Sequence, residues 1–170
     1  MPKAPYLRIL FEADDQGILD TDKLVNSLSL SRSTIKRYLK ELERQGFLEK
    51  IDVNKYKLTE NGLKLKQSLS RALETEEAAP YIITDPASGQ PLPLAVKNHE
   101  QLFVVIKYGL ADSKILDEHI KRKYLSKWLR DVIGDEYLAS LIDEGRIDSS
   151  EKLQEYLEEI VRFKKLYRKA

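Results

Sequence analysis

Apolar residues recur at helical spacing along much of the chain, and the clearest pattern covers residues 32–45. In this stretch the apolar side chains share one side of the helix, and the polar and cationic side chains share the opposite side. Ser31 precedes the stretch, where its side-chain oxygen can accept a backbone N–H of the first turn. Gly46 follows it, at the position where a left-handed residue ends many helices. The expected buried side consists of Ile35, Tyr38, Leu39 and Leu42.

Two runs of alternating apolar residues come next and predict a short antiparallel hairpin. They cover residues 47–51 and 56–59 and flank a polar tip at 52–55. The other elements predicted in this part of the chain are a helix over 5–13, a strand at Ile18 and Leu19, a helix over 22–27, and a helix over 60–76 that Thr59 can cap.

The order of these elements resembles the winged helix-turn-helix family of small DNA-binding regulators, of the MarR/ArsR-like kind, in an archaeal or thermophilic form. The resemblance covers residues 5–76 and is carried by the run LSRSTIKRYLKELERQGFLEK and by the later YKLTENG. In that family the first run is the recognition helix leading into the wing. The second run is the return strand of the wing, followed by a further helix. The resemblance therefore implies that the partner is double-stranded DNA.

After residue 76 the sequence changes to a linker with a second hairpin and then to helices. Acidic and small residues followed by Pro80 place a boundary near residues 77–80. Prolines in the second strand of this hairpin cannot donate hydrogen bonds, so that strand should lie on an edge. The predicted fold class is mainly α with small β-hairpins. The predicted parts are a winged helix-turn-helix domain (1–76), a linker and β-hairpin (77–97) and a helical module (98–170).

Capping residues divide the helical module into several predicted helices. Asn98 and Gln101 have the spacing of a capping box, and the apolar run 102–106 predicts burial on nearly all sides. The later helices are expected to start at Asp112 (with an apolar face reaching Tyr124), at Ser126, at Asp135 and at Asp148, where Glu151 completes the cap.

The last predicted helix has an apolar side broader than one small neighbour would cover. It packs across the helical module or pairs with a second copy, and the second arrangement is favoured because two copies at a fixed spacing increase the specificity of a winged helix. The helix over 60–76 is the other candidate for the joining surface. The helical module also provides a surface for a protein partner. The apolar side consists of Leu153, Tyr156, Leu157, Ile160, Phe163 and Tyr167.

Composition limits the classes of protein and site. The chain is 42% hydrophobic and 34% charged with a net charge of +1, as expected of a soluble globular protein. It has no apolar run near the ~20 residues of a membrane span, and its N-terminus has no signal-peptide pattern, so we expect a cytoplasmic protein. The absence of cysteine excludes disulfides, thiolate metal sites and cysteine nucleophiles. The Lys and Glu content suits a thermophilic source.

Positive charge is concentrated where the resemblance places DNA. Residues 32–57 carry eight cations and four anions, a net charge of +4, whereas residues 1–31 have a net charge of −2. Arginine and lysine on a recognition helix can contact guanine edges and phosphates. An ordinary solvated surface is the other interpretation of the helix, and edge protection is the other interpretation of the wing lysines. The candidate DNA-binding residues are Arg32, Ser33, Thr34, Lys36, Arg37, Lys40, Arg44, Lys55 and Lys57.

The sequence contains no local signature of catalysis or of a cofactor site, so we expect no enzyme and no cofactor. His99 and His119 are too isolated to hold a metal. His99 is expected to be exposed at a helix start, and His119 is expected to be a hydrogen-bonded core residue. The acidic pairs 14–15 and 135–136 fall at turns or helix starts, where acids are favoured by the helix dipole.

The function that these patterns favour is regulation of transcription by binding of duplex DNA through the 32–45 helix and the 47–59 wing. The alternative is a winged helix that contacts proteins in transcription, replication or division machinery, with the basic helix face meeting an acidic partner. The near-neutral net charge keeps this alternative open.

Overall fold

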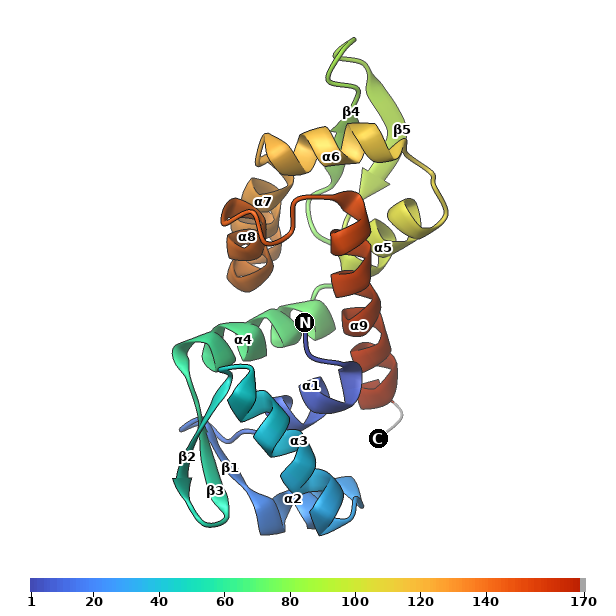
Figure 1. Cartoon of the computed structure of the whole chain (residues 1–170). Helices are drawn as coiled ribbons and strands as arrows, with labels where there is room; N and C mark the ends of the chain where they lie inside the picture. The colour runs from blue at the N-terminus through green and yellow to red at the C-terminus, as the bar shows by residue number, and fades with distance from the viewer. Residues whose placement is uncertain (169–170) are drawn as a thin grey trace.

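The computed structural model describes residues 1–168. It is mainly α-helical with two small antiparallel sheets, so the predicted fold class is confirmed. None of the described helices is long and apolar enough to span a membrane. The first part of the chain contains α1 (Ala4–Phe11), β1 (Ile18–Asp20), α2 (Thr21–Leu28), α3 (Arg32–Arg44), β2 (Leu48–Asp52), β3 (Lys55–Leu58) and α4 (Glu60–Glu74) (Figure 1).

The ends of α3 form as the local sequence predicts. Ser31 Oγ accepts the backbone N–H of Thr34 at 3.2 Å and caps the helix. Gly46 has a φ of +80°, and its N–H donates to the carbonyl of Glu43, while the N–H of Phe47 donates to the carbonyl of Leu42 at 2.9 Å. This pair of bonds is the Schellman arrangement, which requires a left-handed residue at Gly46. The turn from the helix into the wing is therefore set by local chemistry.

The three-stranded sheet has the order β1-β3-β2, and all its strand pairs are antiparallel. Leu48, Tyr56 and Leu58 are buried on the inner face. Lys57 lies on the outer face, in register with Ile18 on one side and Glu49 on the other. The sheet therefore packs one side on the helices and exposes a mixed-charge side.

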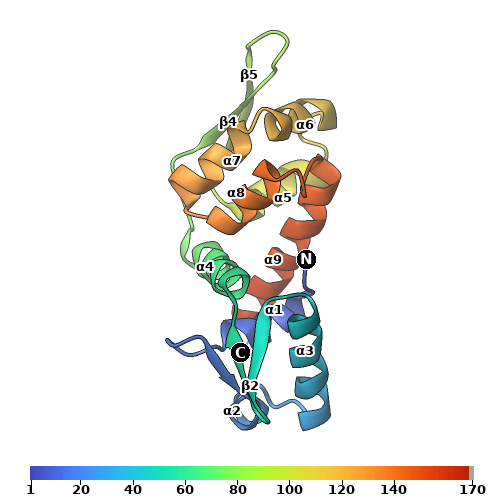
Figure 2. The same cartoon turned by 60° about the vertical axis from the view of Figure 1, so that its left-hand side comes forward.

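The second part of the chain contains a two-stranded sheet and further helices. The hairpin projects beyond the helices at the end of the molecule opposite the wing (Figures 1 and 2). The elements are β4 (Tyr81–Thr84), β5 (Pro91–Val96), α5 (His99–Lys107), α6 (Ser113–Lys121), α7 (Tyr124–Trp128), the π-helical turn η1 (Leu129–Ile133), α8 (Glu136–Asp143) and α9 (Ser150–Arg168).

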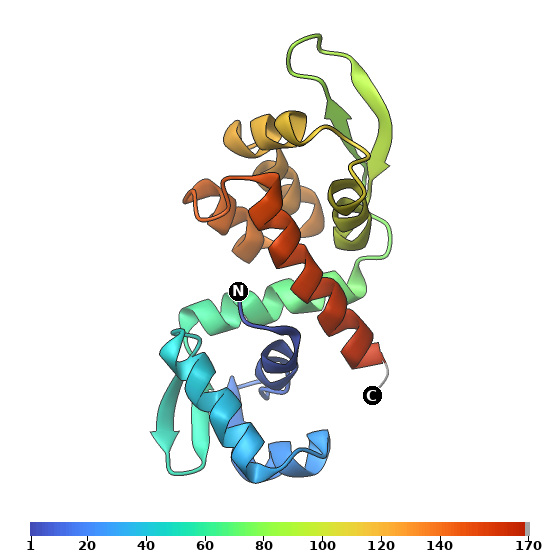
Figure 3. The same cartoon turned by 45° about the vertical axis from the view of Figure 1, so that its right-hand side comes forward.

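The last helix, α9, packs against the first helix, α1. It runs from beside α5 to α1, as Figures 1 and 3 show. The Glu159 carboxylate on α9 accepts the backbone N–H of Ala4 at 2.8 Å, which satisfies one of the free amides at the start of α1. The ring of Phe163 meets that of Phe11 edge-on, with centroids 5.4 Å apart. One continuous hydrophobic cluster therefore includes side chains from the first and last helices.

The prediction that the apolar side of α9 joins two copies is wrong. Most of these side chains are already covered within one chain, because α9 packs against α1, α4, α5 and α6. Tyr167 is the only member of the set that is substantially exposed. The breadth of the apolar side is explained by neighbours on several sides. The buried members are Leu153, Tyr156, Leu157, Ile160 and Phe163.

Two expectations for the ends of helices are also wrong, and a third is confirmed in part. The last helix is capped by Ser149, whose Oγ accepts the N–H of Lys152 at 3.3 Å, whereas Asp148 pairs with the Lys152 ammonium. Tyr124 begins α7 instead of continuing the preceding helix, because the chain turns at Lys123 with a φ of +61°. Asn98 caps α5 by accepting the N–H of Gln101 at 2.9 Å, but Gln101 accepts the N–H of Lys97, one residue before the amide that a capping box uses.

The apolar run 102–106 is less buried than predicted. Val104 is 42% exposed, whereas Leu102, Phe103 and Val105 are buried. Helical periodicity decides which residues of this run are buried, because α5 has only one side against the core and Val104 lies on the other side. The apolar run alone does not show that neighbours cover the whole helix.

His99 is buried, contrary to expectation, with 1% of its surface exposed. Its Nε2 lies 2.8 Å from Oδ2 of Asp135, which is also fully buried. The other carboxylate oxygen of Asp135 accepts the N–H of Leu138 and caps α8. The starts of α5 and α8 therefore meet through a polar contact that the sequence does not indicate.

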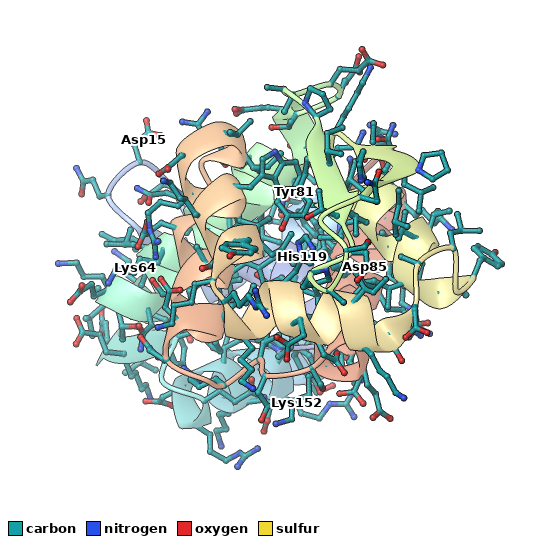
Figure 4. All side chains as sticks on the ribbon, turned by 90° about the horizontal axis from the view of Figure 1, so that it is seen from above. Asp15, Lys64, Tyr81, Asp85, His119 and Lys152 are labelled. Atoms are coloured by element: carbon teal, nitrogen blue, oxygen red, sulfur yellow. The ribbon has the colours of Figure 1, made fainter. Side chains whose placement is uncertain are left out.

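His119 is a hydrogen-bonded core residue, as predicted. Its Nε2 lies 2.7 Å from the carbonyl oxygen of Thr84, and its Nδ1 pairs with the Tyr81 hydroxyl. Because a carbonyl can only accept, Nε2 must donate, so in the neutral ring Nδ1 accepts from Tyr81. Figure 4 shows the Tyr81 and His119 side chains side by side. The pair ties the projecting hairpin to α6.

Candidate nucleic-acid interface

The packing of α3 decides which of its side chains can meet a partner. Ile35, Leu39 and Leu42 are fully buried, so the helix is fixed with its opposite side toward solvent. Tyr38 meets the ring of Tyr6 on α1 edge-on, with centroids 4.5 Å apart. The exposed side of α3 carries Ser33, Lys36, Arg37, Lys40 and Arg44.

These exposed side chains gather on one concave surface. A shallow pocket of about 620 Å³ is lined by the five of them together with Tyr6 and Glu41. Lys36, Arg37 and Lys40 have no carboxylate within ion-pair distance among residues 1–168. We call Ser33, Lys36, Arg37 and Lys40 the α3 face. It offers three cations and a hydroxyl to a partner without first breaking an ion pair.

Two predicted site residues are instead engaged by acids. The Arg44 guanidinium donates to both carboxylate oxygens of Glu41, at 2.6 and 3.0 Å. These hydrogen bonds, with one from Gln45, lower the pKa of Glu41 to about 2. Glu41 is therefore ionised at neutral pH and holds Arg44. Arg32 forms an ion pair with Asp22, with Arg32 Nη2 2.6 Å from Asp22 Oδ1.

The start of α3 places its two hydroxyl residues differently. Thr34 Oγ1 lies 2.9 Å from the capping oxygen of Ser31, and its side chain is half-buried. Ser33 is exposed, although its hydroxyl also lies 3.0 Å from Ser31 Oγ. Ser33 is the more accessible of the two for a phosphate oxygen.

On the wing, the structure places both predicted lysines on the outer face of β3. Lys57 lies opposite Glu49, and Lys55 lies opposite Asp20 and Asp52 in the two strand pairs. Facing acids partly balance the positive charge of this face. The wing is therefore less cationic than the α3 face.

Sequence reasoning missed the apolar residues near the wing tip. Ile51 is 49% exposed and Val53 is 74% exposed. Ile51 lies at the register shift between Lys50 and Asp52, where a β-bulge leaves a residue unpaired, and Val53 lies in the turn between β2 and β3. The sequence carries no local signal for this register shift, so it did not indicate that Ile51 is exposed.

Helices α1, α2 and α3 form a three-helix core, and α2, a turn and the capped helix α3 form a helix-turn-helix. The wing and the further helix α4 follow. This order of elements defines a winged helix-turn-helix domain. Residues 6–77 match the family model described as "Winged helix-turn-helix", so this part of the chain is such a domain. Domains of this class typically bind DNA and are not enzymes, so the match suggests DNA binding. Comparisons with curated proteins and with solved structures gave no match.

The described residues contain no group of three or more His, Cys, Asp or Glu side chains that could hold a metal ion. The His99–Asp135 pair is buried, and it joins the starts of α5 and α8. The candidate interface is therefore one of hydrogen-bond donors and charge.

Proposed function

We propose that the protein regulates transcription by binding duplex DNA through α3 and the β2–β3 wing. The α3 face is the observation that carries this proposal, because its cations are exposed, close together and without ion pairs among the described residues. An α-helix fits the major groove, where Arg and Lys donate to guanine edges and to phosphates. The winged helix-turn-helix fold supports the same use of this helix.

The side chains of the interface have different roles in DNA binding because their surroundings differ. Lys36, Arg37 and Lys40 reach bases or phosphates directly, and Ser33 donates to a phosphate at the start of the helix. Arg32 and Arg44 contribute less, because each must first leave a carboxylate. Lys55 and Lys57 contact the DNA backbone and position the protein without reading bases.

The assembly that we propose is a homodimer in which each copy reads one half-site. The two copies must meet through side chains other than the buried side of α9. We divide the chain into the parts 1–76, 77–97 and 98–170. To the third part, the helical module, we assign the additional role of contacting a protein partner. Light scattering of the full chain tests the dimer, and a monomer would contradict it.

A titration of random-sequence duplex DNA at several salt concentrations tests the function. With about four phosphate contacts per copy, log K should fall against log salt with a slope near −4 for one copy and near −7 for a pair. The absence of binding at low salt, or an affinity that does not change with salt concentration, would contradict the proposal.

One observation favours protein binding as a second candidate function. Ile51 and Val53 expose apolar surface at the wing tip, near Lys55, which lies opposite Asp52. Exposed apolar side chains rimmed by polar residues are typical of protein interfaces. This candidate would be supported if the chain shows no salt-dependent affinity for DNA and if its wing tip becomes protected when it binds a partner protein.

A further inference from the structure

The shallow pocket beside the α3 face has one wall that α3 does not supply. This wall is Tyr6, which lies on α1, whereas the other residues that line the pocket are all on α3. Helix α1 packs against α3 (Figures 1 and 3). Tyr6 is not among the nine candidate DNA-binding residues that the sequence indicates, so the role of this side chain is a separate question.

The position of Tyr6 is fixed by the packing of α1. The next residue, Leu7, is fully buried, and the Glu159 carboxylate accepts the backbone N–H of Ala4 at the start of the helix. The ring of Tyr6 also contacts the ring of Tyr38 edge-on. Tyr6 is therefore held beside α3 before any partner arrives, which lowers the entropy cost of a contact with that partner.

The hydroxyl group of Tyr6 is accessible to a partner. Within residues 1–168 it has no hydrogen-bond partner, and it is not among the buried polar atoms that lack one. A phenol can donate one hydrogen bond and is uncharged at neutral pH. Tyr6 therefore offers the pocket a neutral donor on a side chain that is already in place.

The cations of the α3 face border the same pocket. Positive charge gathered in a concave surface attracts anionic groups to it. Glu41 also lines the pocket, but its carboxylate already accepts hydrogen bonds from Arg44 and Gln45. A phosphate that the cations draw into the pocket therefore meets the hydroxyl of Tyr6 on the side toward α1.

Tyr6 also acts on Arg37, through the ring of Tyr38. The Arg37 guanidinium lies over this ring, with its Cζ 5.3 Å from the ring centroid. A cation in this position is attracted by the electrons of the ring face. Because Tyr6 packs against the same ring, the three side chains form a continuous row from α1 to the α3 face. Loss of the Tyr6 ring would leave Tyr38, and with it Arg37, less restricted.

We propose that Tyr6 is part of the DNA interface, with its hydroxyl donating to a backbone phosphate and its ring positioning Arg37 through Tyr38. This inference rests on the proposed function and extends the interface from α3 and the wing to α1. Many hydrogen bonds between proteins and DNA go to phosphate oxygens, and tyrosine is one of their donors. An uncharged donor adds affinity without adding to the release of counterions, so its contribution differs from that of a lysine or an arginine.

The test of the hydroxyl contact compares Tyr6→Phe with the parent in titrations of duplex DNA at several salt concentrations. Loss of a hydrogen bond to a charged group should weaken binding about tenfold at every salt concentration. The slope of log K against log salt should equal that of the parent, because no cation is removed, whereas Lys40→Ala should reduce the slope by about 1. Tyr38→Phe removes a hydroxyl from the neighbouring ring, which does not line the pocket, and should bind as the parent does.

Equal affinities of Tyr6→Phe and the parent overturn the hydroxyl contact, and so does an equal loss of affinity in Tyr38→Phe. A melting temperature that falls in Tyr6→Phe also overturns it, because the hydroxyl would then be bonded within the protein. If the parent does not bind a duplex even at low salt, the proposed function fails and this contact fails with it. If the parent binds and Tyr6→Phe binds equally well, only the contact fails.

A double-mutant cycle tests the positioning of Arg37. Arg37→Ala is combined with Tyr6→Phe, which keeps the ring, and separately with Tyr6→Leu, which removes it. With Tyr6→Phe the two losses of affinity should multiply, as expected of independent contacts. With Tyr6→Leu the combined loss should be smaller than the product, because Arg37 is already less well positioned, and Tyr38→Leu should show the same pattern. Losses that multiply in all three combinations overturn the positioning role and leave the hydroxyl contact standing.

Discussion

Helices α3 and α9 are both amphipathic and both start at a serine cap, yet the molecule uses them in opposite ways. The apolar side of α3 packs on α1 and α2, and its cationic side faces solvent. The apolar side of α9 is covered by helices from both ends of the chain, and a carboxylate on it, Glu159, caps α1. One helix presents a surface to a partner, and the other holds the molecule together.

The comparison shows what an amphipathic pattern means. A stripe of apolar residues shows that one side of a helix is buried, but it does not show what buries it. For α3 the neighbours α1 and α2 precede it in the same predicted domain, so the expectation was correct. For α9 one neighbour is α1, at the other end of the chain, so a second copy was inferred where the chain itself supplies the partner.

The largest expected effect comes from breaking the packing of α9. Phe163→Ala removes a fully buried ring that contacts Phe11, and should lower the free energy of unfolding by about 3–5 kcal/mol. Because α9 packs on both parts, denaturation followed by circular dichroism and by Trp128 fluorescence should show one coincident transition. Loss of only the C-terminal signal, with the winged helix intact, would contradict the bridging role. Tyr167→Ala, at an exposed position of the same stripe, is the matched control.

The next effect tests the exposed side of α3. Arg37→Glu with Lys40→Glu should reduce duplex affinity by a factor of about 100 or more, because two cations become anions at the interface. The melting temperature should barely change, since neither side chain is buried. Filter binding or fluorescence anisotropy measures the affinity. Lys121→Glu with Lys127→Glu makes the same charge change on α6 and α7 and should have a much smaller effect. Equal losses in the two double variants would mean that general charge, and not α3, attracts DNA.

A smaller effect is expected on the wing. Lys55→Ala with Lys57→Ala should weaken binding to all duplex sequences by a similar factor, about tenfold, and should reduce the salt slope by about 2. The reason is that backbone contacts position the protein without specifying bases. Competition with several unrelated duplexes measures this. A loss restricted to one sequence would show that the wing reads bases.

The smallest expected effect is a gain in affinity for DNA. Glu41→Gln removes an anion next to the α3 face and releases Arg44, so DNA affinity should rise by a factor of about 3 and the salt slope should steepen by about 1. The pKa of Glu41 is lowered to about 2, so this carboxylate stays ionised above that pH. The Glu41–Arg44 contact is thus present at neutral pH and is lost only as the pH falls toward 2. The gain should therefore be equal at pH 5.5 and pH 8. An unchanged affinity would mean that Arg44 does not approach DNA.

Much of the winged helix could be predicted because its signals are local. Ser31, Gly46 and Thr59 act within a few residues, and their side chains or φ angles fix the ends of α3 and the start of α4. Alternation predicted the wing, and periodicity predicted the buried side of α3. The exposure of Ile51 and the pairing of Arg32 with Asp22 could not be seen, because each depends on how separate segments come together. Whether the nine candidate residues bind DNA stays a prediction.

By itself, the sequence determined the order of helices and hairpins and the cationic side of α3, because caps, turns and periodicity operate over one or two turns of chain. Only the tertiary structure decided that α9 packs on α1, that His99 is buried against Asp135, and that Phe47 and Arg146 line one pocket. These contacts join residues from 36 to 155 positions apart. Local patterns carry no information about such partners, because any apolar or charged surface of the right shape would satisfy the same side chain.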